Sequence, residues 1–417
     1  MRILKLTPQV EAKLMDMRES KDRAALRVAV KIVADVKRRG DAALDHWSLA
    51  LDGVNLKRDG LWVSQERMAA ARRRVSSDFV GAVEHAARNV RAVAEKQMPR
   101  PWSLEVEPGV NIAQVIRGID SVGCYIPGGR FALFSTLIMT VIPALVAGVK
   151  RIVAVCPRAN DEVLAAAHVL GVPHLARIGG AQAIAALAYG TKRVSRVEKI
   201  FGPGNRFVTA AKQLVGNDCG IDLPAGPTEA IVLARRGNPG WIAADLLAQA
   251  EHAPDAESFL VTPSAKLARA VQSEIARQVR LLPPNNLAHQ SCPGTGAILV
   301  AASWKKAIDF VNRFAPEHLS LPESSAELLD RIRSAGTIFV GPVSAQPFGD
   351  YASGSNHVLP TAGWAKRRGG LSVLDFVKQF TVQTIGREGY QRLAADVQTM
   401  AHAEGLLAHA KAVEVRR

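Results

Sequence analysis

The chain has 417 residues, with 53 Lys and Arg against 38 Asp and Glu, so its formal net charge is +15. Hydrophobic residues make up 48% and charged residues 22%, which excludes wholesale disorder, and the length predicts at least two domains. An excess of basic over acidic residues of this size occurs in proteins that bind nucleic acid or acidic membranes, and in proteins that merely have a well-solvated surface. Composition alone does not choose among these classes.

The four cysteines form no C-x-x-C pair, which excludes a cysteine zinc site and a disulfide scaffold. They stand at positions 124, 156, 219 and 292. The first residues, MRILKLTPQVEAKL, lack the apolar run of a signal peptide. We therefore expect a cytoplasmic protein.

The first hundred residues are predicted to form charged amphipathic helices, because apolar residues recur there at intervals of three and four. Residues 99–108 contain three prolines and are predicted to be a connection.

From about residue 120 onward, strand-like and helix-like segments alternate, which predicts parallel sheets built from β-α-β units. The expected strands are SVGCYI, RIVAVC, LARIG, EAIVLA, SFLVTP, AILVA and TIFVG. The expected helices include DEVLAAAHVL, AQAIAALAYG, NRFVTAAKQLV, WIAADLLAQAEH, AKLARAVQSEIARQVRLL and WKKAIDFVNRF. Residues 350–369 are predicted to be a loop, and the tail from about 371 to be helical without a further strand.

Residues 131–149 carry no charge and approach the length of a membrane helix. Pro143 and Gly148 lie inside this run, and strand-like segments flank it on both sides. These features favour a buried helix between two parallel strands over a membrane span.

Three glycine turns follow expected strands, at 125–129 (YIPGG), 179–182 (GGAQ) and 202–207 (GPGNRF). The last approaches a dinucleotide fingerprint but has Phe207 where a third small residue is needed, so a plain strand-to-helix turn remains an alternative. The turns at 125–129 and 179–182, at the carboxyl ends of adjacent expected strands, indicate a ligand crevice.

The sequence contains only weak local patterns that indicate a metal site or acid–base catalysis. Gln249 and His252 are three residues apart near a predicted helix end and can share a face, although capping and surface polarity also explain such a pair. Glu317 and His318 would place two proton-transfer groups on one loop. Asp350 and His357 share a glycine-rich loop, where turn formation is the alternative role.

Basic clusters at 37–39, 72–74 and 366–368 raise the alternative of a nucleic-acid-binding protein. They lack interleaved aromatic residues and the chain carries no zinc-finger or RNA-recognition signature, so a solvated helix face is favoured.

Eight sequence blocks occur in one fixed order from about residue 120 to the end of the chain. They are GCYIPGG, GGAQAIAALAYG, KIFGPGN, IDLPAGPTE, DLLAQAEH, FAPEHL, GDYASGSNHVLPT and AEGLLAHA. These blocks and their order resemble those of the histidinol dehydrogenase family. The resemblance implies an α/β fold with two incomplete Rossmann-like domains and small helical N- and C-terminal extensions. The implied boundaries are 1–19 for the N-terminal extension, 20–123 with 229–370 for the first domain, 124–228 for the second, cofactor-contacting domain, and 371–417 for the tail.

The same resemblance implies an NAD- and zinc-dependent enzyme that oxidises L-histidinol to L-histidine through the aldehyde, with two NAD, at the last step of histidine biosynthesis. One zinc ion per subunit is expected, chiefly to hold and orient the substrate. Its implied ligands are Gln249, His252, Asp350 and His409. These four residues and His318 are also expected to contact the substrate.

His318 is implied to be the general base and Glu317 the residue that activates water. Further substrate contacts are implied for Thr228, His357 and Glu404, and cofactor contacts for Tyr125, Gln182 and Asn205. The family also implies a homodimer in which the terminal helices, with Glu404 and His409, reach the partner's active site.

Three alternatives stay open beside this interpretation. One is a related enzyme that oxidises another small polar alcohol, such as a sulfonated diol, and another is a basic nucleic-acid-binding protein. The third concerns Cys124, which stands beside a cofactor turn and could form a thiohemiacetal with the aldehyde, although the glutamate–water route needs no thiol.

Overall fold

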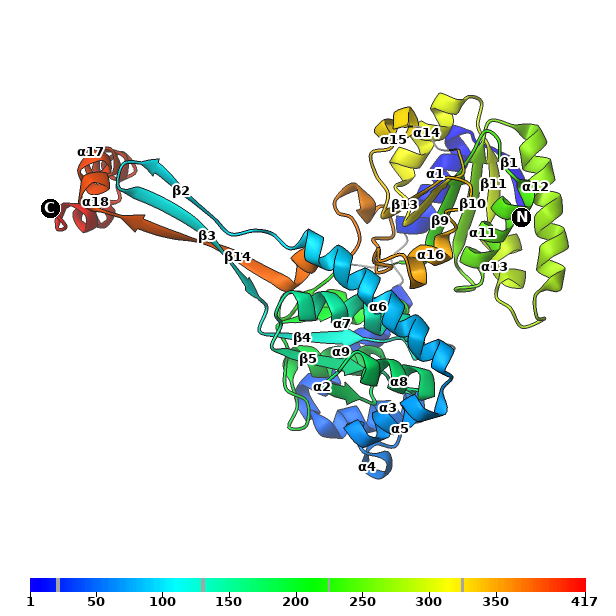
Figure 1. Cartoon of the computed structure of the whole chain (residues 1–417), viewed down its shortest axis with the longest axis horizontal. Coiled ribbons are helices and arrows are strands. Elements are labelled where there is room, and N and C mark those ends of the chain that lie inside the picture. The colour runs from blue at the N-terminus through cyan, green and yellow to red at the C-terminus, as the bar shows by residue number, and fades with distance from the viewer. Residues whose placement is uncertain (20–22, 129–131, 224–225, 324–325) are drawn as a thin grey trace.

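A computed structural model describes residues 1–19, 23–128, 132–223, 226–323 and 326–417. These residues form two helix-covered parallel sheets and a long antiparallel arm that extends away from one of them (Figure 1). The predicted mixed α/β class with parallel sheets is confirmed.

The six-stranded sheet contains the N-terminal strand together with strands from the second half of the chain, all parallel. Its strands, in spatial order, are β1 (Arg2–Lys5), β11 (Ala297–Val300), β10 (Glu257–Thr262), β9 (Glu229–Leu233), β12 (His318–Leu321) and β13 (Thr337–Val340). Its helices are α1 (Pro8–Glu19), α11 (Pro239–Ala250), α12 (Ala265–Gln278), α13 (Ala288–Gly294), α14 (Trp304–Phe314), α15 (Ala326–Arg331) and α16 (Gln346–Tyr351).

The five-stranded sheet is also parallel throughout. Its strands, in spatial order, are β6 (His174–Ala176), β5 (Arg151–Val155), β4 (Ser121–Tyr125), β7 (Lys199–Phe201) and β8 (Gly220–Ile221). Its helices are α2 (Arg23–Arg39), α3 (Asp41–Asp52), α4 (Leu56–Asp59), α5 (Gln65–Arg74), α6 (Ser77–Gln97), α7 (Ser135–Val146), α8 (Asp161–Val169), α9 (Gly180–Tyr189) and α10 (Arg206–Val215).

The N-terminal helices pack differently from the grouping implied by the family resemblance. Apolar side chains of α2, α3, α5 and α6 share two buried clusters with the five-stranded sheet and its helices. Residues 23–97 therefore belong with that sheet, whereas we expected them beside 229–370. The expected helical extension at 1–19 also contains strand β1, which pairs with β11.

The uncharged stretch contains α7, whose residues from Ser135 to Ala144 are all buried. Phe131 itself lies outside the described residues. In the parts of the chain that the structure covers, no helix combines the length and apolarity needed to cross a bilayer. The prediction of a buried helix is confirmed for α7.

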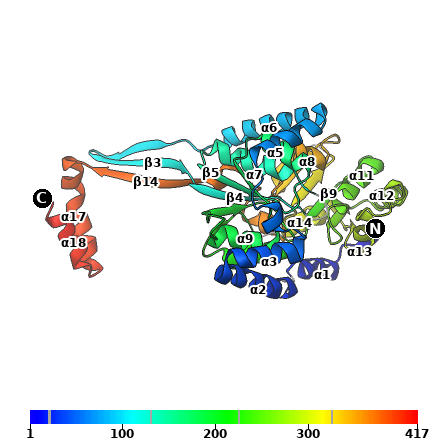
Figure 2. The same cartoon turned by 90° about the horizontal axis from the view of Figure 1, so that it is seen from below.

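The arm consists of three antiparallel strands, none of which was predicted from the sequence. They are β2 (Trp102–Glu107), β3 (Val110–Gly118) and β14 (Val377–Ile385), and helices α17 (Arg387–Ala403) and α18 (Leu407–Glu414) lie at the arm's far end (Figures 1 and 2). The predictions of a connection at 99–108 and of a tail without strands were wrong. Strands β2 and β14 are largely exposed, so they lack the apolar runs by which the buried strands were recognised.

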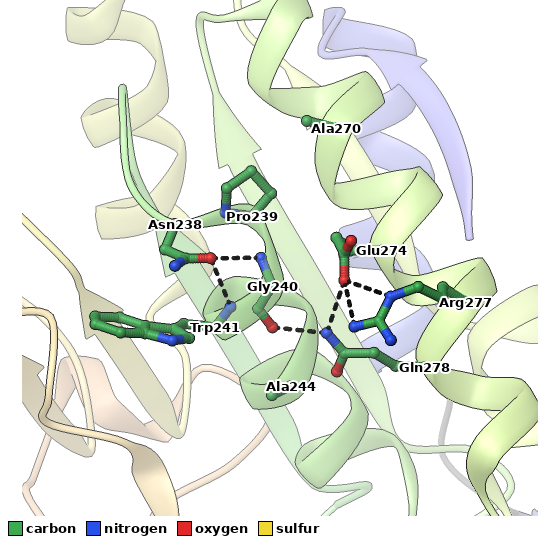
Figure 3. Close-up of a pocket in the computed structure, with 9 residues that line it drawn as sticks. All are labelled: Asn238, Pro239, Gly240, Trp241, Ala244, Ala270, Glu274, Arg277 and Gln278. Carbon is green, nitrogen blue, oxygen red and sulfur yellow. Dashed lines mark hydrogen bonds and ion pairs between the residues drawn. The ribbon is translucent and has the colours of Figure 1, made fainter.

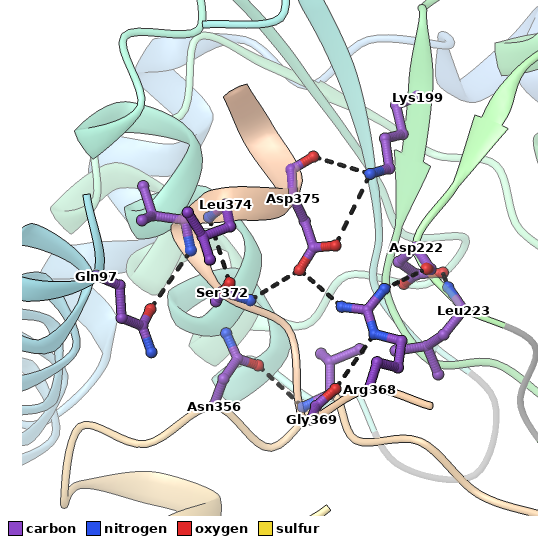
Figure 4. Close-up of polar contacts among 12 residues, drawn as sticks. Gln97, Lys199, Asp222, Leu223, Asn356, Arg368, Gly369, Ser372, Leu374 and Asp375 are labelled. Carbon is purple, nitrogen blue, oxygen red and sulfur yellow. Dashed lines mark hydrogen bonds and ion pairs between the residues drawn. The ribbon is translucent and has the colours of Figure 1, made fainter. Parts of the chain in front are cut away.

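The base of the arm is fastened to the five-stranded sheet by a polar network (Figure 4). The Arg368 guanidinium donates to the backbone oxygen of Asp222 at 2.7 Å and to the carboxylate of Asp375 at 2.7 Å. Lys199 donates to the backbone oxygen of Asp375 at 2.9 Å. Phe376, which ends the 3-10 turn before β14, stacks on Phe201 of β7 at 3.9 Å. These contacts fix where the arm leaves the body.

Candidate active site

The predicted catalytic residues meet where two neighbouring strands begin. Thr228 and Glu317 directly precede β9 and β12, which are paired, and His318 is the first residue of β12. Gln249 lies in the last turn of α11, which runs back to this edge of the sheet. The predicted loop position of His318 was wrong, because the short HLSL segment was not recognised as a strand.

The carboxylate of Glu317 is held by two donors. The Thr228 hydroxyl donates to Oε2 at 2.6 Å, and the backbone N–H of Glu229 donates to the same atom at 2.8 Å. Burial raises the pKa of this carboxyl, although His318 and the two donors oppose the shift. A buried carboxyl with a raised pKa is suited to exchange protons.

The imidazole of His318 is buried and has one ring nitrogen engaged. Its Nδ1 atom lies 3.2 Å from the backbone oxygen of Glu229, an acceptor, so Nδ1 carries the proton in the neutral ring. Its Nε2 atom is buried without a hydrogen-bond partner in the described ranges, and lies 3.6 Å from Oδ1 of Asp350. Burial favours the neutral ring, but the carboxylates of Glu317 and Asp350 outweigh it and raise the pKa of His318.

Three of the four residues implied as zinc ligands come from this edge of the six-stranded sheet. His252 lies two residues beyond the end of α11, and Asp350 lies in α16 and not in the predicted loop. Burial disfavours the charged form of Asp350, yet the imidazoles of His318, His357 and His252 lower its pKa.

The donor types fit a zinc ion, and the ring of His252 is oriented as a ligating histidine requires. Nδ1 of His252 bonds the backbone oxygen of Ala248 at 2.9 Å, which leaves Nε2 as the electron-pair donor, as ligating histidines require. The Gln249 side chain is fixed at both ends, since its Nε2 donates to Thr228 and its Oε1 accepts from Gln346, each at 2.6 Å. Within the described ranges, no three His, Cys, Asp or Glu side chains of the single chain gather around a metal position.

Two implied residues of the substrate and metal site, Glu404 and His409, lie apart from this group. Glu404 follows α17 and His409 lies in α18, both at the far end of the arm (Figure 1). The single chain therefore does not bring them to Gln249, His252 and Asp350.

His357 connects the two sheets at the site. Its Nδ1 atom lies 2.8 Å from the backbone oxygen of Asp350, and its Nε2 atom lies 3.3 Å from the hydroxyl of Thr136 in α7. Burial lowers the pKa of His357. Nearby, Asn356 donates to the backbone oxygen of Met139 at 2.7 Å, so this loop is fixed to the five-stranded unit.

The implied cofactor residues lie at the carboxyl edge of the five-stranded sheet. The Tyr125 hydroxyl accepts from the backbone N–H of Gly180 at 3.1 Å, and Gln182 donates to Asp52 at 2.8 Å. Both side chains are buried. Asn205 instead caps α10 by accepting from Phe207 and Val208 at 3.0 and 3.1 Å. Gly129, the last residue of the first glycine turn, lies outside the described residues.

Two of these turns meet at the point where the strand order reverses. Counted along the chain, the five strands follow the spatial order 3-2-1-4-5, so β4 and β7 flank the position where doubly wound sheets bind ligands. Gly202, after β7, has φ +114°, and a Cβ there would lie 2.2 Å from the backbone oxygen of Tyr125. Only glycine permits this close approach of the two turns.

A surface pocket at the opposite end of α11 does not belong to this site (Figure 3). There Asn238 accepts from the backbone N–H of Gly240 at 2.8 Å, and Gln278 donates to the backbone oxygen of Gly240 at 2.8 Å. Glu274 is paired with Arg277 at 2.9 Å. These hydrogen bonds and this ion pair engage part of the polar lining of the pocket.

Sequence reasoning missed several residues that support the site. Gln346 orients Gln249, Thr136 bonds His357, and the backbone of Glu229 holds both Glu317 and His318. No spacing signal marks these contacts, because each joins segments far apart in the chain.

Together, two parallel sheets covered by helices, a buried Glu–His pair and glycine turns at a strand switch point define an α/β enzyme. The family model for histidinol dehydrogenase matches residues 15–417. The chain belongs to the histidinol dehydrogenase family.

Individual relatives agree with this assignment. Histidinol dehydrogenase of Agrobacterium fabrum is 45% identical over 391 residues, which is 92% of this chain and 90% of the relative. The Escherichia coli enzyme is 43% identical, over 94% of this chain and 91% of its own. The crystal structure of histidinol dehydrogenase from Elizabethkingia anophelis superimposes with a TM-score of 0.93 at 36% identity, covering 100% of this chain and 98% of that one.

Proposed function

We propose that this protein oxidises L-histidinol to L-histidine through the aldehyde, transferring one hydride to each of two NAD molecules, as a cytoplasmic enzyme of histidine biosynthesis. The observation that carries the proposal is the buried pair of Glu317 and His318. In the described ranges the Nε2 atom of His318 has no hydrogen-bond partner, and it lies 3.6 Å from Oδ1 of Asp350. A general base with one nitrogen held and the other free is what abstraction of a hydroxyl proton needs.

In the first oxidation, Nε2 of His318 takes the hydroxyl proton of the alcohol. At the same time, a hydride is transferred to NAD from the carbon that bears this hydroxyl group. The Nδ1–H bond to the Glu229 backbone oxygen keeps the base in the required tautomer. The Glu317 and Asp350 carboxylates stabilise the imidazolium that forms.

In the second oxidation, Glu317 takes a proton from water as the water oxygen adds to the aldehyde carbon, which gives the singly deprotonated hydrate. This anion transfers the second hydride from its carbon to the second NAD and becomes the carboxylic acid. Burial raises the pKa of Glu317, which makes its carboxylate a stronger base than an exposed one. Thr228 and the Glu229 N–H hold Oε2, and thereby fix the position of the carboxylate.

Gln249, His252 and Asp350 would hold zinc together with His409, and bound zinc would supply a Lewis-acid site that holds and orients the nitrogen atoms of the substrate. Substrate contacts are proposed for Thr228, His357 and Glu404 as well. Cofactor contacts are proposed for Tyr125, Gln182 and Asn205, around the switch point of the five-stranded sheet.

We further propose a homodimer with shared active sites, in which each arm carries Glu404 and His409 to the other subunit. The position of α17 and α18 at the tip of the arm supports this (Figure 2), as do the exposed apolar side chains along the arm. The exposed apolar side chains of the arm include Trp102, Leu104, Val106, Phe380, Val382, Met400 and Leu407. Exposed apolar patches of this kind mark protein–protein contacts.

The test is an assay of NAD reduction with L-histidinol before chelation, after chelation and after readdition of zinc. We expect about two NADH per histidinol, loss of turnover on chelation and recovery with zinc. A folded, zinc-loaded protein without histidinol turnover would overturn the proposal. Turnover of a sulfonated diol instead would identify a related enzyme of different specificity.

A further inference from the structure

The N-terminal helix α1 reaches the back of the catalytic pair through a buried ion pair. The Arg18 guanidinium binds the Glu229 carboxylate through two hydrogen bonds, of 2.8 and 2.5 Å. The side chains of Arg18 and Glu229 are only 5% and 2% exposed. A buried pair of this kind costs desolvation free energy, so its presence calls for a role other than stability alone.

Glu229 is the residue that holds both proton-transfer groups. Its backbone N–H donates to Glu317 at 2.8 Å, and its backbone oxygen lies 3.2 Å from Nδ1 of His318. Any shift of the Glu229 backbone therefore moves the carboxylate and the imidazole together.

Arg18 also holds the chain segment that leads to the catalytic pair. Its Nη1 atom donates to the backbone oxygen of Phe314 at 2.5 Å, and its guanidinium lies 3.6 Å above the Phe314 ring. Only Pro316 and Ala315 separate Phe314 from Glu317. Arg18 thus contacts both Glu229, which holds the pair, and the segment that leads to the pair.

The backbone around this ion pair is strained at two alanines. Ala315 has φ 53° and Ala362 has φ 52°, and they are the two non-glycine residues with positive φ in the described ranges. Ala315 follows the Phe314 oxygen that Arg18 binds, and the Ala362 N–H donates to Glu229 at 2.9 Å. Strained residues persist where the surrounding contacts determine the backbone, and they concentrate at functional sites.

We propose that Arg18 and Glu229 are positioning residues that hold Glu317 and His318 in their reactive arrangement; the inference rests on the proposed function of that pair. Arg18 acts through Glu229 and the Phe314 backbone. Misplacement of catalytic groups by about 1 Å can lower a rate by about 100-fold, so the contribution to kcat is measurable.

The experiment compares Arg18→Met with a matched control, Arg313→Met, in the zinc-loaded enzyme. Arg313 also joins α14 to α1, through Glu11, but it is half-exposed and, within the described ranges, forms no hydrogen bond or ion pair with Glu229, Glu317 or His318. We expect Arg18→Met to lower kcat at least about 10-fold while the KM values for histidinol and NAD stay within about threefold. Arg313→Met should leave kcat within about twofold of the wild type, and Arg18→Lys should recover part of the loss.

Removal of Arg18 alone leaves a buried carboxylate unpaired, so a second variant separates positioning from folding. Arg18→Met/Glu229→Gln removes both charges and should fold like the wild type while its kcat stays at least about 10-fold low. Wild-type kcat in this folded double variant would overturn the proposal. Equal losses of kcat in Arg18→Met and Arg313→Met would also overturn it, because α1 would then act only as a support of the fold.

A readout without substrate distinguishes this inference from the proposed function. If the wild type does not oxidise histidinol, the proposed function fails, and amide exchange then tests the positioning. The peptide 226–233, which contains the Glu229 N–H, should exchange at least about 10-fold faster in Arg18→Met than in the wild type or Arg313→Met. Equal exchange in all three proteins would overturn the positioning role.

Discussion

The hydroxyl of Thr228 donates to Oε2 of Glu317 at 2.6 Å while it accepts from Nε2 of Gln249, also at 2.6 Å. One hydroxyl thus joins the residue proposed to activate water to a proposed zinc ligand. No side chain without both a donor and an acceptor can replace it.

Thr228→Val should therefore lower kcat by about 10- to 100-fold, because Glu317 loses a donor and the Gln249 amide is left unpaired in a buried place. Thr228→Ser keeps the hydroxyl and should stay within about threefold of the wild type. Steady-state rates of NAD reduction at saturating histidinol check this, with circular dichroism to confirm folding. Equal rates for the two variants would show that the hydroxyl does not matter.

Complementation between subunits tests the shared site. His252→Ala and His409→Ala should each be inactive alone, because each removes a proposed ligand from every site of a homodimer. Heterodimers made by co-expression of the two variants should regain activity, since one of their two sites has both histidines. The measurement is turnover of the doubly tagged heterodimer, with each homodimer as control; no activity in a proven heterodimer would contradict a shared site.

How far the sequence predicted the site depends on where each residue lies. Gln249 and Glu317 were predicted to be site residues because the ordered motifs contain them, and the buried strands were predicted from their apolar runs. His318 and Asp350 were placed in loops, because HLSL is too short to read as a strand and the glycine-rich surroundings of Asp350 conceal a helix of six residues. Tertiary contacts decide such short elements.

The supporting contacts had no local signature at all. Arg18 and Glu229 are 211 positions apart in the chain, and Glu229 contacts the catalytic pair through its backbone atoms, which every residue type has and which therefore leave no mark in the sequence. The exposed strands β2 and β14 were not predicted for a different reason. Both lie on the arm and lack the buried face whose apolar pattern makes a strand recognisable in a sequence.

The close approach of two turns at the switch point predicts the effect of Gly202→Ala. The added Cβ would lie 2.2 Å from the backbone oxygen of Tyr125, and φ +114° disfavours any side chain, so the two turns must separate. We expect the Kd of NADH to rise at least about 10-fold, as measured by fluorescence titration. Zinc content should stay unchanged, because the proposed ligands lie on other elements; NADH binding like that of the wild type would exclude these turns as the cofactor site.

Cys124 is not suited to form a covalent intermediate. It is fully buried, and burial raises the pKa of its thiol to about 12, so the thiolate is scarce at neutral pH. Cys124→Ser should keep kcat within about threefold of the wild type, and iodoacetamide should leave Cys124 unlabelled in the folded enzyme while labelling it after denaturation. A folded Cys124→Ser enzyme that turns over at least about 100-fold more slowly than the wild type would revive the thiohemiacetal route.

A buried carboxyl on β10 predicts a pH dependence of stability. Glu257 lies opposite Glu229 of the neighbouring strand β9 in the strand register, and it is only 7% exposed. Its Oε2 atom has no hydrogen-bond partner among the residues that the structure covers. Burial, assisted by the charge of Glu229, raises its pKa from 4.5 to about 8. Because the folded-state pKa is the higher one, the folded protein holds this proton more tightly than the unfolded chain does. Its contribution to stability is therefore present below about pH 4.5 and is lost as the pH rises to about 8.

Glu257→Gln removes this dependence, because a neutral amide replaces a carboxyl that must ionise in a buried place. The variant and the wild type should unfold at similar temperatures near pH 5, and the variant should become more stable by about 1 kcal/mol or more near pH 9. Thermal unfolding across this range checks it. Glu274→Gln serves as a control, since Arg277 lowers the pKa of Glu274 and this variant should gain nothing as the pH rises. A difference between Glu257→Gln and the wild type that does not change with pH would show that Glu257 is ionised throughout.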